Sequence, residues 1–380
     1  MFNSMYNYTQ RVKKQDDFES ESLFRKIFKY LRLMKNIVYI KTIQLLAFIT
    51  LICISCTDQR NGGDNKGDSK KAANETQKDQ PDLFAKKEID TAQYNKILKA
   101  LANNDSTGRW PAKAPYPLPG AILPFHRIVA FYGNLYSKKM GILGELPKDE
   151  MLKKLKGEVA KWQAADTSLP VIPALHYVAV TAQGAAGKDG KHRLRMPGHQ
   201  IDTILNWANS INGLVFLDIQ VGHSTVRDEV PPLEKYLSMP NVHLGIDPEF
   251  SMKGGEVPGS KIGTYNAEDI NDAVNFLASV VKKNNLPPKI LVVHRFTSAM
   301  VRGYDKIKKV PEVQIVMDMD GWGDKTLKKS SYILYEFQAP VQFTGFKLFY
   351  KNDIKKDPNG LYTPEEILQF TPKPIYIQYQ

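Results

Sequence analysis

Eight short runs rich in β-branched and aromatic residues alternate with amphipathic stretches, and this alternation constrains the fold more than any other feature. The runs cover residues 127–133, 171–177, 214–221, 242–249, 290–295, 313–320, 343–350 and 375–379. Helical periodicity is clearest at residues 148–165, 198–211, 267–284 and 325–338, with Asn266 and Asp324 at N-cap positions. Strands that alternate with helices in this way indicate a parallel sheet.

The number of runs predicts an α/β fold with a single (β/α)8 barrel of the TIM type. Residues 121–380 come close to the roughly 250 residues that such a barrel typically needs. A doubly wound open sheet is the alternative, but no Gly-rich phosphate loop follows the first run, which disfavours a nucleotide enzyme. No helical stretch follows the eighth run. We therefore expect the last barrel helix to be missing and residues 91–103 to pack in its place.

A signal for export lies at residues 34–55. Lys35 and Lys41 form a short basic region, and the apolar run that follows, residues 43–54, has the length of a signal-peptide core. A membrane-spanning helix needs about 20 residues. Ser55 and Cys56 then resemble a bacterial lipobox. The resemblance implies that the chain is cleaved before Cys56, lipidated on it, and anchored at a membrane of the cell envelope. An uncleaved anchor helix is the alternative.

The segments on either side of this signal have separate interpretations. Residues 1–33 are predicted to be a spurious extension from a misplaced start codon, since export signals normally begin at the N-terminus. Residues 56–90 are rich in Asn, Gly, Asp, Lys, Ser and Gln and carry few large apolar residues, which predicts a flexible tether. Residues 91–120 are then a helix and lead-in, and residues 121–380 are the barrel.

Charge and cysteine content exclude several classes of protein. Lys and Arg number 52 against 40 Asp and Glu, a net charge of +12, but no dense basic block marks a nucleic-acid surface. The two cysteines are Cys53 and Cys56 in the apolar N-terminal run. A disulfide framework and a cysteine-ligated zinc site are therefore excluded for the barrel.

The alternation of side chains along each strand predicts which residues point into the barrel. In the run 242–249, His243, Gly245, Asp247 and Glu249 share one face, and the opposite face is apolar. The outer face of a barrel strand packs against helices, so the polar face points inward, toward the C-terminal mouth. The same parity places inside His176, Asp218, Gln220, His294, Asp318, Asp320, Lys347 and Gln378. Buried ionisable groups are costly, so we interpret this cluster as a ligand-binding mouth.

The carboxylates of this cluster predict an acid–base site. Glycoside hydrolysis requires two carboxyl groups in different environments. We predict that Glu249 is the acid, because the apolar neighbour Phe250 raises the pKa of a carboxyl group. Asp247 is expected to hold Glu249 or to stabilise positive charge on the sugar. Asp320 or Asp218 is expected to take the second catalytic role.

The other inward-facing residues are expected to bind a carbohydrate substrate. Aromatic side chains on which sugar rings could stack are Tyr132, Tyr177, Trp322 and Phe349. The polar residues of the predicted binding site are Glu145, on the loop after the first strand, and His176, Gln220, His294, Asp318, Lys347 and Gln378. This interpretation requires no cofactor.

The arrangement resembles the (β/α)8 glycoside hydrolases, several of which carry their acid at the end of strand four. The local similarity is to the chitinase-like family 18 signature Asp-Gly-x-Asp-x-Asp-x-Glu, which Asp247-Pro248-Glu249 matches. Its other positions are occupied by Val242, His243 and Gly245, so the substrate-assisted mechanism of that family is not implied. Met317-Asp-Met-Asp320 is similar to its Met-x-Tyr-Asp. The blocks 245–250 and 345–350 also look like those of uncharacterised secreted bacterial proteins.

Two other functions stay open at this point. A metal-dependent hydrolase or phosphodiesterase could bind one or two divalent ions, since carboxylate and imidazole groups are suitable ligands. Its candidate ligands are Asp218, His223, Asp247, Glu249, His294 and Asp318. A non-catalytic glycan-binding lipoprotein would use the same lining without an acid–base pair.

Overall fold

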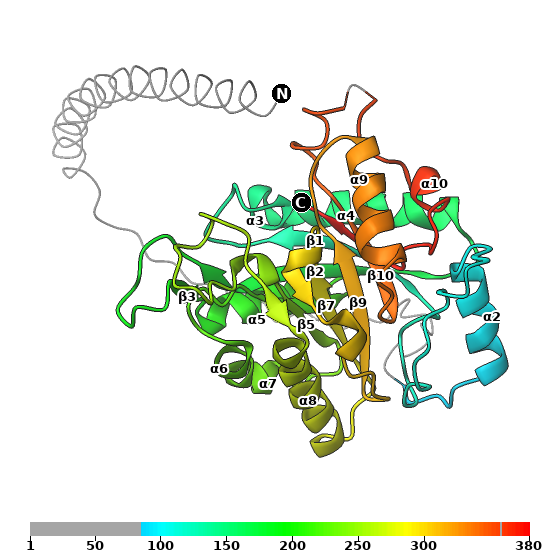
Figure 1. Ribbon diagram of the computed structural model, residues 1–380, viewed down its shortest axis with the longest axis horizontal. Helices are drawn as coiled ribbons and strands as arrows, with labels where there is room; N and C mark the ends of the chain where they lie inside the picture. Colours follow the sequence, from blue (N-terminus) through cyan, green and yellow to red (C-terminus); the bar gives the residue numbers. More distant parts are fainter. Residues whose placement is uncertain (1–84, 358) are drawn as a thin grey trace, which may run out of the picture. The chain divides into compact units, whose positions relative to one another are not determined.

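The computed structural model describes residues 85–357 and 359–380. The predicted signal peptide, the predicted lipidation at Cys56 and most of the predicted tether therefore lie outside the described residues. All eight predicted strands are present, and they form a closed barrel of parallel strands (Figure 1). They are β1 (Arg127–Gly133), β2 (Val171–Ala182), β4 (Leu214–Ile219), β5 (Val242–Ile246), β7 (Lys289–His294), β9 (Val313–Met319), β10 (Phe343–Leu348) and β11 (Tyr376–Tyr379).

The first and last strands close the barrel. Ile128 of β1 lies opposite Tyr376 of β11 on one side and Ile172 of β2 on the other, both in parallel register. The predicted (β/α)8 fold is thus confirmed, and the open-sheet alternative is wrong.

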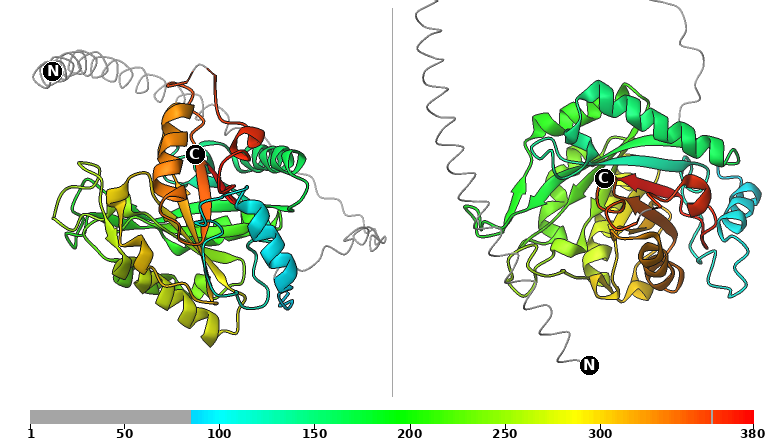
Figure 2. Two further views of the ribbon diagram at one scale, coloured as in Figure 1. Left: turned by 45° about the vertical axis from the view of Figure 1, so that its right-hand side comes forward. Right: turned by 90° about the horizontal axis from the view of Figure 1, so that it is seen from above.

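Helices cover the outside of the barrel (Figure 2). The longer ones are α4 (Lys148–Ala165), α5 (Gly198–Asn209), α8 (Ala267–Lys283) and α9 (Lys325–Tyr332), which the π-helical turn η5 (Ile333–Phe337) continues. Asn266 forms a capping box with Asp269 before α8, and Asp324 accepts a hydrogen bond from the Leu327 amide at the start of α9. Both predicted N-caps are confirmed, because these side chains satisfy amides that the first helical turn leaves free.

Short elements fill the connections. The short helices are α3 (Ile142–Glu145), α6 (Val226–Glu229), α7 (Glu234–Leu237) and α10 (Pro364–Ile367), and the 3-10 turns are η1 (Pro231–Leu233), η2 (Pro248–Phe250), η3 (Ser298–Met300) and η4 (Tyr304–Lys306). Two small strands, β6 (Tyr265–Asn266) and β8 (Val301–Arg302), pair with each other. β2 runs five residues beyond its predicted end because β3 (Arg193–Arg195) pairs with it in antiparallel register.

The sequence led us to expect that residues 91–103 would take the place of the missing eighth barrel helix. Helix α2 (Thr91–Leu101) does not take that place. Leu101 packs among the interior residues near the N-terminal ends of the strands, and its carbonyl accepts a hydrogen bond from Lys373, ahead of β11. The outer face of β11 is covered instead by α4, where the Trp162 indole donates to the Tyr379 hydroxyl at 3.0 Å. α2 therefore helps to close the bottom of the barrel.

Two apolar layers hold the fold together. The outer layer packs outward-facing strand residues such as Phe131 and Leu217 against the helices. The inner layer fills the lower barrel with residues such as Ile128, Phe216 and Val292. Side chains in the upper barrel are polar, so the apolar filling stops below the C-terminal mouth. Within the described residues, no helix is long and apolar enough to span a membrane.

Candidate active site

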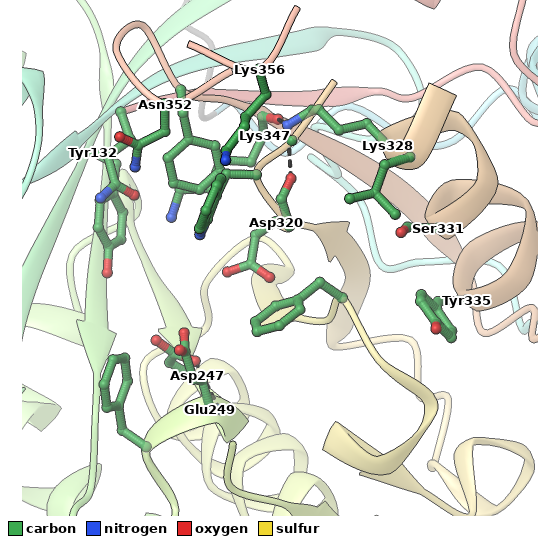
Figure 3. A pocket seen from close by; sticks show the side chains of 18 of the residues that line it. Tyr132, Asp247, Glu249, Asp320, Lys328, Ser331, Tyr335, Lys347, Asn352 and Lys356 are labelled. Atoms are coloured by element: carbon green, nitrogen blue, oxygen red, sulfur yellow. Dashed lines mark hydrogen bonds between the residues drawn. The ribbon is translucent and has the colours of Figure 1, made fainter. Parts of the chain in front are cut away.

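A cavity of about 910 Å³ opens at the C-terminal ends of the barrel strands (Figure 3). Three of its carboxylates lie at strand ends, Asp247 and Glu249 after β5 and Asp320 after β9, and a fourth, Asp324, caps α9. Figure 3 shows the Asp320 carboxylate pointing toward those of Asp247 and Glu249. Other residues that line it include Tyr132, Gln220, Phe250, Phe296, Trp322, Lys328, Tyr335, Lys347, Phe349, Asn352 and Lys356. Three carboxyl groups from two strand ends thus share one cavity.

The sequence Asp-Pro-Glu fixes the position of Glu249. Asp247 is the N-cap of η2, and its Oδ1 accepts a hydrogen bond from the Glu249 amide at 3.0 Å. Pro248 follows at the first position of the turn, where its missing N–H and fixed φ angle suit helical geometry. Gln220 holds the other carboxylate oxygen, Oδ2 of Asp247, at 3.2 Å. Asp247 therefore orients the backbone that carries Glu249.

Burial changes the acidity of this pair. Burial first, and then the charge of Asp320, raise the pKa of Glu249 to about 7, against the opposing charges of Lys347 and His294. Burial also raises the pKa of Asp247 well above its ordinary value. Removing a carboxylate from water penalises its charged form, and a second carboxylate nearby adds repulsion. Near neutral pH, Glu249 can therefore carry and release a proton.

Lysines lie at the opposite end of the cavity from Asp247 and Glu249 (Figure 3). The ammonium of Lys328 is buried and contacts Asp353 Oδ2 at 3.0 Å and two backbone carbonyls, and burial lowers its pKa to about 8. Lys347 is buried as well, with its Nζ 3.7 Å from the centroid of the Tyr132 ring. Among the described residues, no carboxylate forms an ion pair with Lys347. The cavity therefore offers a free cation as well as acids.

A second polar layer lies beneath the cavity, inside the barrel. His176 Nε2 and His294 Nε2 lie 3.4 Å and 3.5 Å from the same atom, Asp218 Oδ1. His294 Nδ1 lies 3.1 Å from Asp320 Oδ2, which joins this layer to the cavity, and 3.5 Å from Asp318 Oδ2. His176, Asp218, His294 and Asp318 are fully buried and do not line the cavity.

Opposite charges within this layer shift the pKa values of its members. Burial alone would lower the pKa of His294, but the charges of Asp218 and Asp320 raise it well above its ordinary value. Burial would likewise raise the pKa of Asp218, but the positive charge of His294 holds it well below its usual range. Burial lowers the pKa of His176 to about 4. Without a bound ion, the layer is thus an Asp218–His294 ion pair beside a neutral His176.

Two glycines leave space for these side chains. A Cβ atom on Gly245 would lie 2.5 Å from Asp218 Oδ1 and 2.6 Å from His176 Nε2. A Cβ atom on Gly345 would lie 2.5 Å from Asp318 Oδ1. Both glycines face inward. Strands β5 and β10 therefore carry no side chain at these positions, which leaves room for the polar side chains of the neighbouring strands.

Several predicted residues lie elsewhere. Glu145 does not reach the cavity, because it is paired with Lys351. The Gln378 amide is buried and donates to the Tyr376 hydroxyl at 3.0 Å. His223 does not line the cavity, and its Nε2 is hydrogen-bonded to the Glu256 carbonyl at 2.7 Å. Tyr177 faces outward, where its hydroxyl bonds to Gln200 of α5. Asp218 lies under the cavity floor and, unlike Asp320, does not line the cavity.

The sequence interpretation missed other lining residues. Lys328, Tyr335, Asn352 and Lys356 come from α9, η5 and the loop after β10 and not from strand ends, so strand parity could not identify them. Tyr376 does not line the cavity but is buried inside the barrel beside His176, and parity could have identified it because it shares the inward face of β11 with Gln378.

Comparisons with known proteins show only distant similarity. No protein-family model and no curated protein sequence matches the chain. Among solved structures, it is similar to dihydropteroate synthase of Burkholderia cenocepacia, solved with 7,8-dihydropteroate, at 9% identity and a TM-score of 0.32, over 70% of this chain and 91% of that one. It is also similar to the C-terminal domain of Legionella pneumophila ChiA, at 10% identity and a TM-score of 0.25, over 58% and 57%. Neither similarity identifies the function.

Proposed function

We propose that this protein is a hydrolase that cleaves glycosidic bonds, with Glu249 as the proton donor and Asp320 as the second carboxylate. One observation carries the proposal: Glu249, whose pKa is raised to about 7, and Asp320 line the same cavity. Glycoside hydrolysis needs two such carboxyl groups, one protonated and one ionised.

The residues have separate roles in this reaction. Glu249 donates its proton to the glycosidic oxygen as the bond between that oxygen and the anomeric carbon breaks. Asp320 either attacks the anomeric carbon or takes a proton from an attacking water, and its charge stabilises the positive charge on the sugar. Asp247 positions Glu249 through its bond to the Glu249 amide. Gln220 in turn holds Asp247.

Aromatic side chains in the cavity support a sugar as the substrate. Trp322 is 53% exposed, and an indole left in water at a cavity wall is available for stacking on a sugar ring. Phe250, Phe296 and Phe349 line the same cavity. The unpaired Lys347 favours a sugar with a carboxylate or other anionic group.

The test is a screen of the full chain against a panel of neutral and acidic polysaccharides, with release of reducing ends as the measurement. The wild type should release reducing ends from at least one member, and Glu249→Gln and Asp320→Asn should release at least about 100-fold less, the scale of a lost general acid. Glu145→Gln, on a carboxyl group outside the cavity, is the matched control. Binding of a glycan without release of reducing ends would indicate a binding protein. Undiminished turnover in Glu249→Gln would contradict the role of Glu249 as proton donor.

We also propose, from the sequence alone, that the enzyme is anchored at the cell envelope by a lipid attached to Cys56. Such an anchor would hold the barrel near a surface glycan at the end of the tether. Intact mass spectrometry of the membrane fraction tests this. The expected species begins at a lipidated Cys56, and a species that retains residues 1–55 would exclude it.

A further inference from the structure

We propose that the polar layer beneath the cavity is a metal site, in which His176 Nε2, Asp218 Oδ1 and His294 Nε2 bind one divalent transition-metal ion of the zinc type. This set keeps Asp218 and His294 from the ligands that the sequence suggested, adds His176, and leaves out His223, Asp247, Glu249 and Asp318. The proposal concerns binding of the ion and holds whether or not the cavity above hydrolyses glycosides.

The spacing of the three atoms fits such an ion. Bonds of about 2.0–2.2 Å in a tetrahedral arrangement leave ligand atoms about 3.3–3.6 Å apart. The two histidine nitrogens lie 3.4 Å and 3.5 Å from Asp218 Oδ1. All three ligand atoms lie within 4.8 Å of one another, so binding needs at most a small approach of the two imidazole rings. Two imidazoles and a carboxylate are a donor set that zinc commonly takes.

The same atoms lack other partners. His176 Nε2, Asp218 Oδ1 and His294 Nε2 are buried, and none of them makes a hydrogen bond of acceptable geometry. Buried polar atoms are normally paired, so unpaired ones that converge on a single point indicate a missing ligand. The inward face of β5 leaves that point open at Gly245, where any side chain would collide with Asp218 and His176.

The opposite side of each ligand is held in place. His176 Nδ1 lies 2.6 Å from the Tyr376 hydroxyl, which also accepts a hydrogen bond from Gln378. His294 Nδ1 lies 3.1 Å from Asp320 Oδ2. The Tyr132 hydroxyl donates to the second oxygen of Asp218 at 3.3 Å. In metal sites, the histidine nitrogen that does not bind the metal typically hydrogen-bonds to an oxygen atom, and this bond orients the ring so that the other nitrogen faces the metal. The Nδ1 contacts of His176 and His294 are of this kind.

Charge also favours an ion here. Three carboxylates lie within 3.5 Å of the His294 imidazole, namely those of Asp218, Asp318 and Asp320. A divalent ion bound by Asp218 and the two histidines would offset this concentration of negative charge.

The test is zinc or cobalt binding to the full chain, made without a histidine tag and dialysed against a chelator. Isothermal titration with zinc chloride should give one high-affinity site per chain. Asp218→Asn, His176→Gln and His294→Gln should each weaken binding at least 100-fold. Tyr376→Phe, which keeps all three ligands, should weaken it about tenfold, the scale of a lost outer partner. Circular dichroism checks that each variant folds.

Two competing sources of binding need matched controls. His192 and His223 lie with their rings 4.3 Å apart, and Cys53 and Cys56 could supply thiolates. His192→Ala with His223→Ala, and Cys53→Ser with Cys56→Ser, should each leave the high-affinity site intact. X-ray absorption of the zinc-loaded wild type should show two imidazoles in the coordination sphere and no sulfur. Absence of binding, loss of the site in either control, or unchanged affinity in Asp218→Asn would overturn the proposal.

Discussion

Replacing Glu249 by glutamine should have opposite effects on stability and on catalysis. The pKa of this carboxyl is raised from 4.5 to about 7. A carboxyl group whose pKa is higher in the folded chain binds its proton more tightly there. Its ionisation therefore destabilises the fold at pH values above its pKa in the folded chain, and it has no effect at pH values below its pKa in the unfolded chain. The penalty therefore develops as the pH rises from about 4.5 to about 7 and persists above it.

The pKa difference sets the size of the effect. At 1.36 kcal/mol per pKa unit, the ionised Glu249 destabilises the fold by at most about 3 kcal/mol. Glutamine fills the same space without titrating. Glu249→Gln should thus be more stable than the wild type by up to about 3 kcal/mol at pH 9 and nearly equal to it at pH 4, while its turnover falls by about 100-fold or more.

The assay is urea unfolding of the wild type and Glu249→Gln at both pH values, followed by circular dichroism. The matched control is Glu88→Gln, an exposed carboxyl group whose loss should change little at either pH. The groups whose charges act on Glu249 are Asp320, which raises its pKa, and Lys347 and His294, which lower it. A stability difference that is the same at pH 4 and pH 9 would refute the reasoning, because it would show that Glu249 ionises as freely in the folded chain as in the unfolded one.

Three further changes test other parts of the site. Gly245→Ala should lower the free energy of unfolding by about 1–3 kcal/mol in urea titrations, because its Cβ would collide with Asp218 and His176. The control Gly157→Ala, on the open surface of α4, should raise the free energy of unfolding by about 0.5–1 kcal/mol. Equal effects of the two substitutions would contradict the close packing at Gly245. Trp322→Ala should raise KM severalfold in steady-state kinetics and leave the unfolding midpoint unchanged, since the side chain is 53% exposed; an unchanged KM would remove it from the binding surface. Lys347→Met should weaken binding of acidic oligosaccharides about tenfold more than binding of neutral ones in calorimetry, and equal losses would exclude an anion contact.

Strand periodicity predicted the barrel and its inward faces because these follow from local physics. Side chains alternate along a strand, and a barrel strand must bury its apolar face under helices. This reasoning turned Asp218, Asp247, Glu249, His294, Asp318 and Asp320 toward the barrel interior, as the structure has them. It expected the whole set at the mouth, whereas Asp218, His294 and Asp318 lie beneath the cavity. Strand alternation assigns each residue a face of the sheet, but it does not fix the height of that residue along the barrel axis.

Periodicity could not predict what depends on loop paths and on contacts between distant segments. Glu145 was expected at the mouth, but Lys351 pairs with it outside the cavity. His223 lies four residues beyond the end of β4, and the loop turns its ring toward the Glu256 carbonyl. The convergence of His176 and His294 on Asp218 involves three strands and the absence of a side chain at Gly245. Such a meeting point requires the closed barrel and cannot be read from any single run.

The most direct test of the proposed mechanism is how the defect of Glu249→Gln depends on the leaving group. The proposal holds that Glu249 gives its proton to the departing oxygen, and a dinitrophenyl glycoside needs no such proton. On the sugar that the screen identifies, kcat/KM of the variant should fall at least about 100-fold for an oligosaccharide and less than about tenfold for the matching dinitrophenyl glycoside. An equal loss on both substrates would show that Glu249 is not the proton donor.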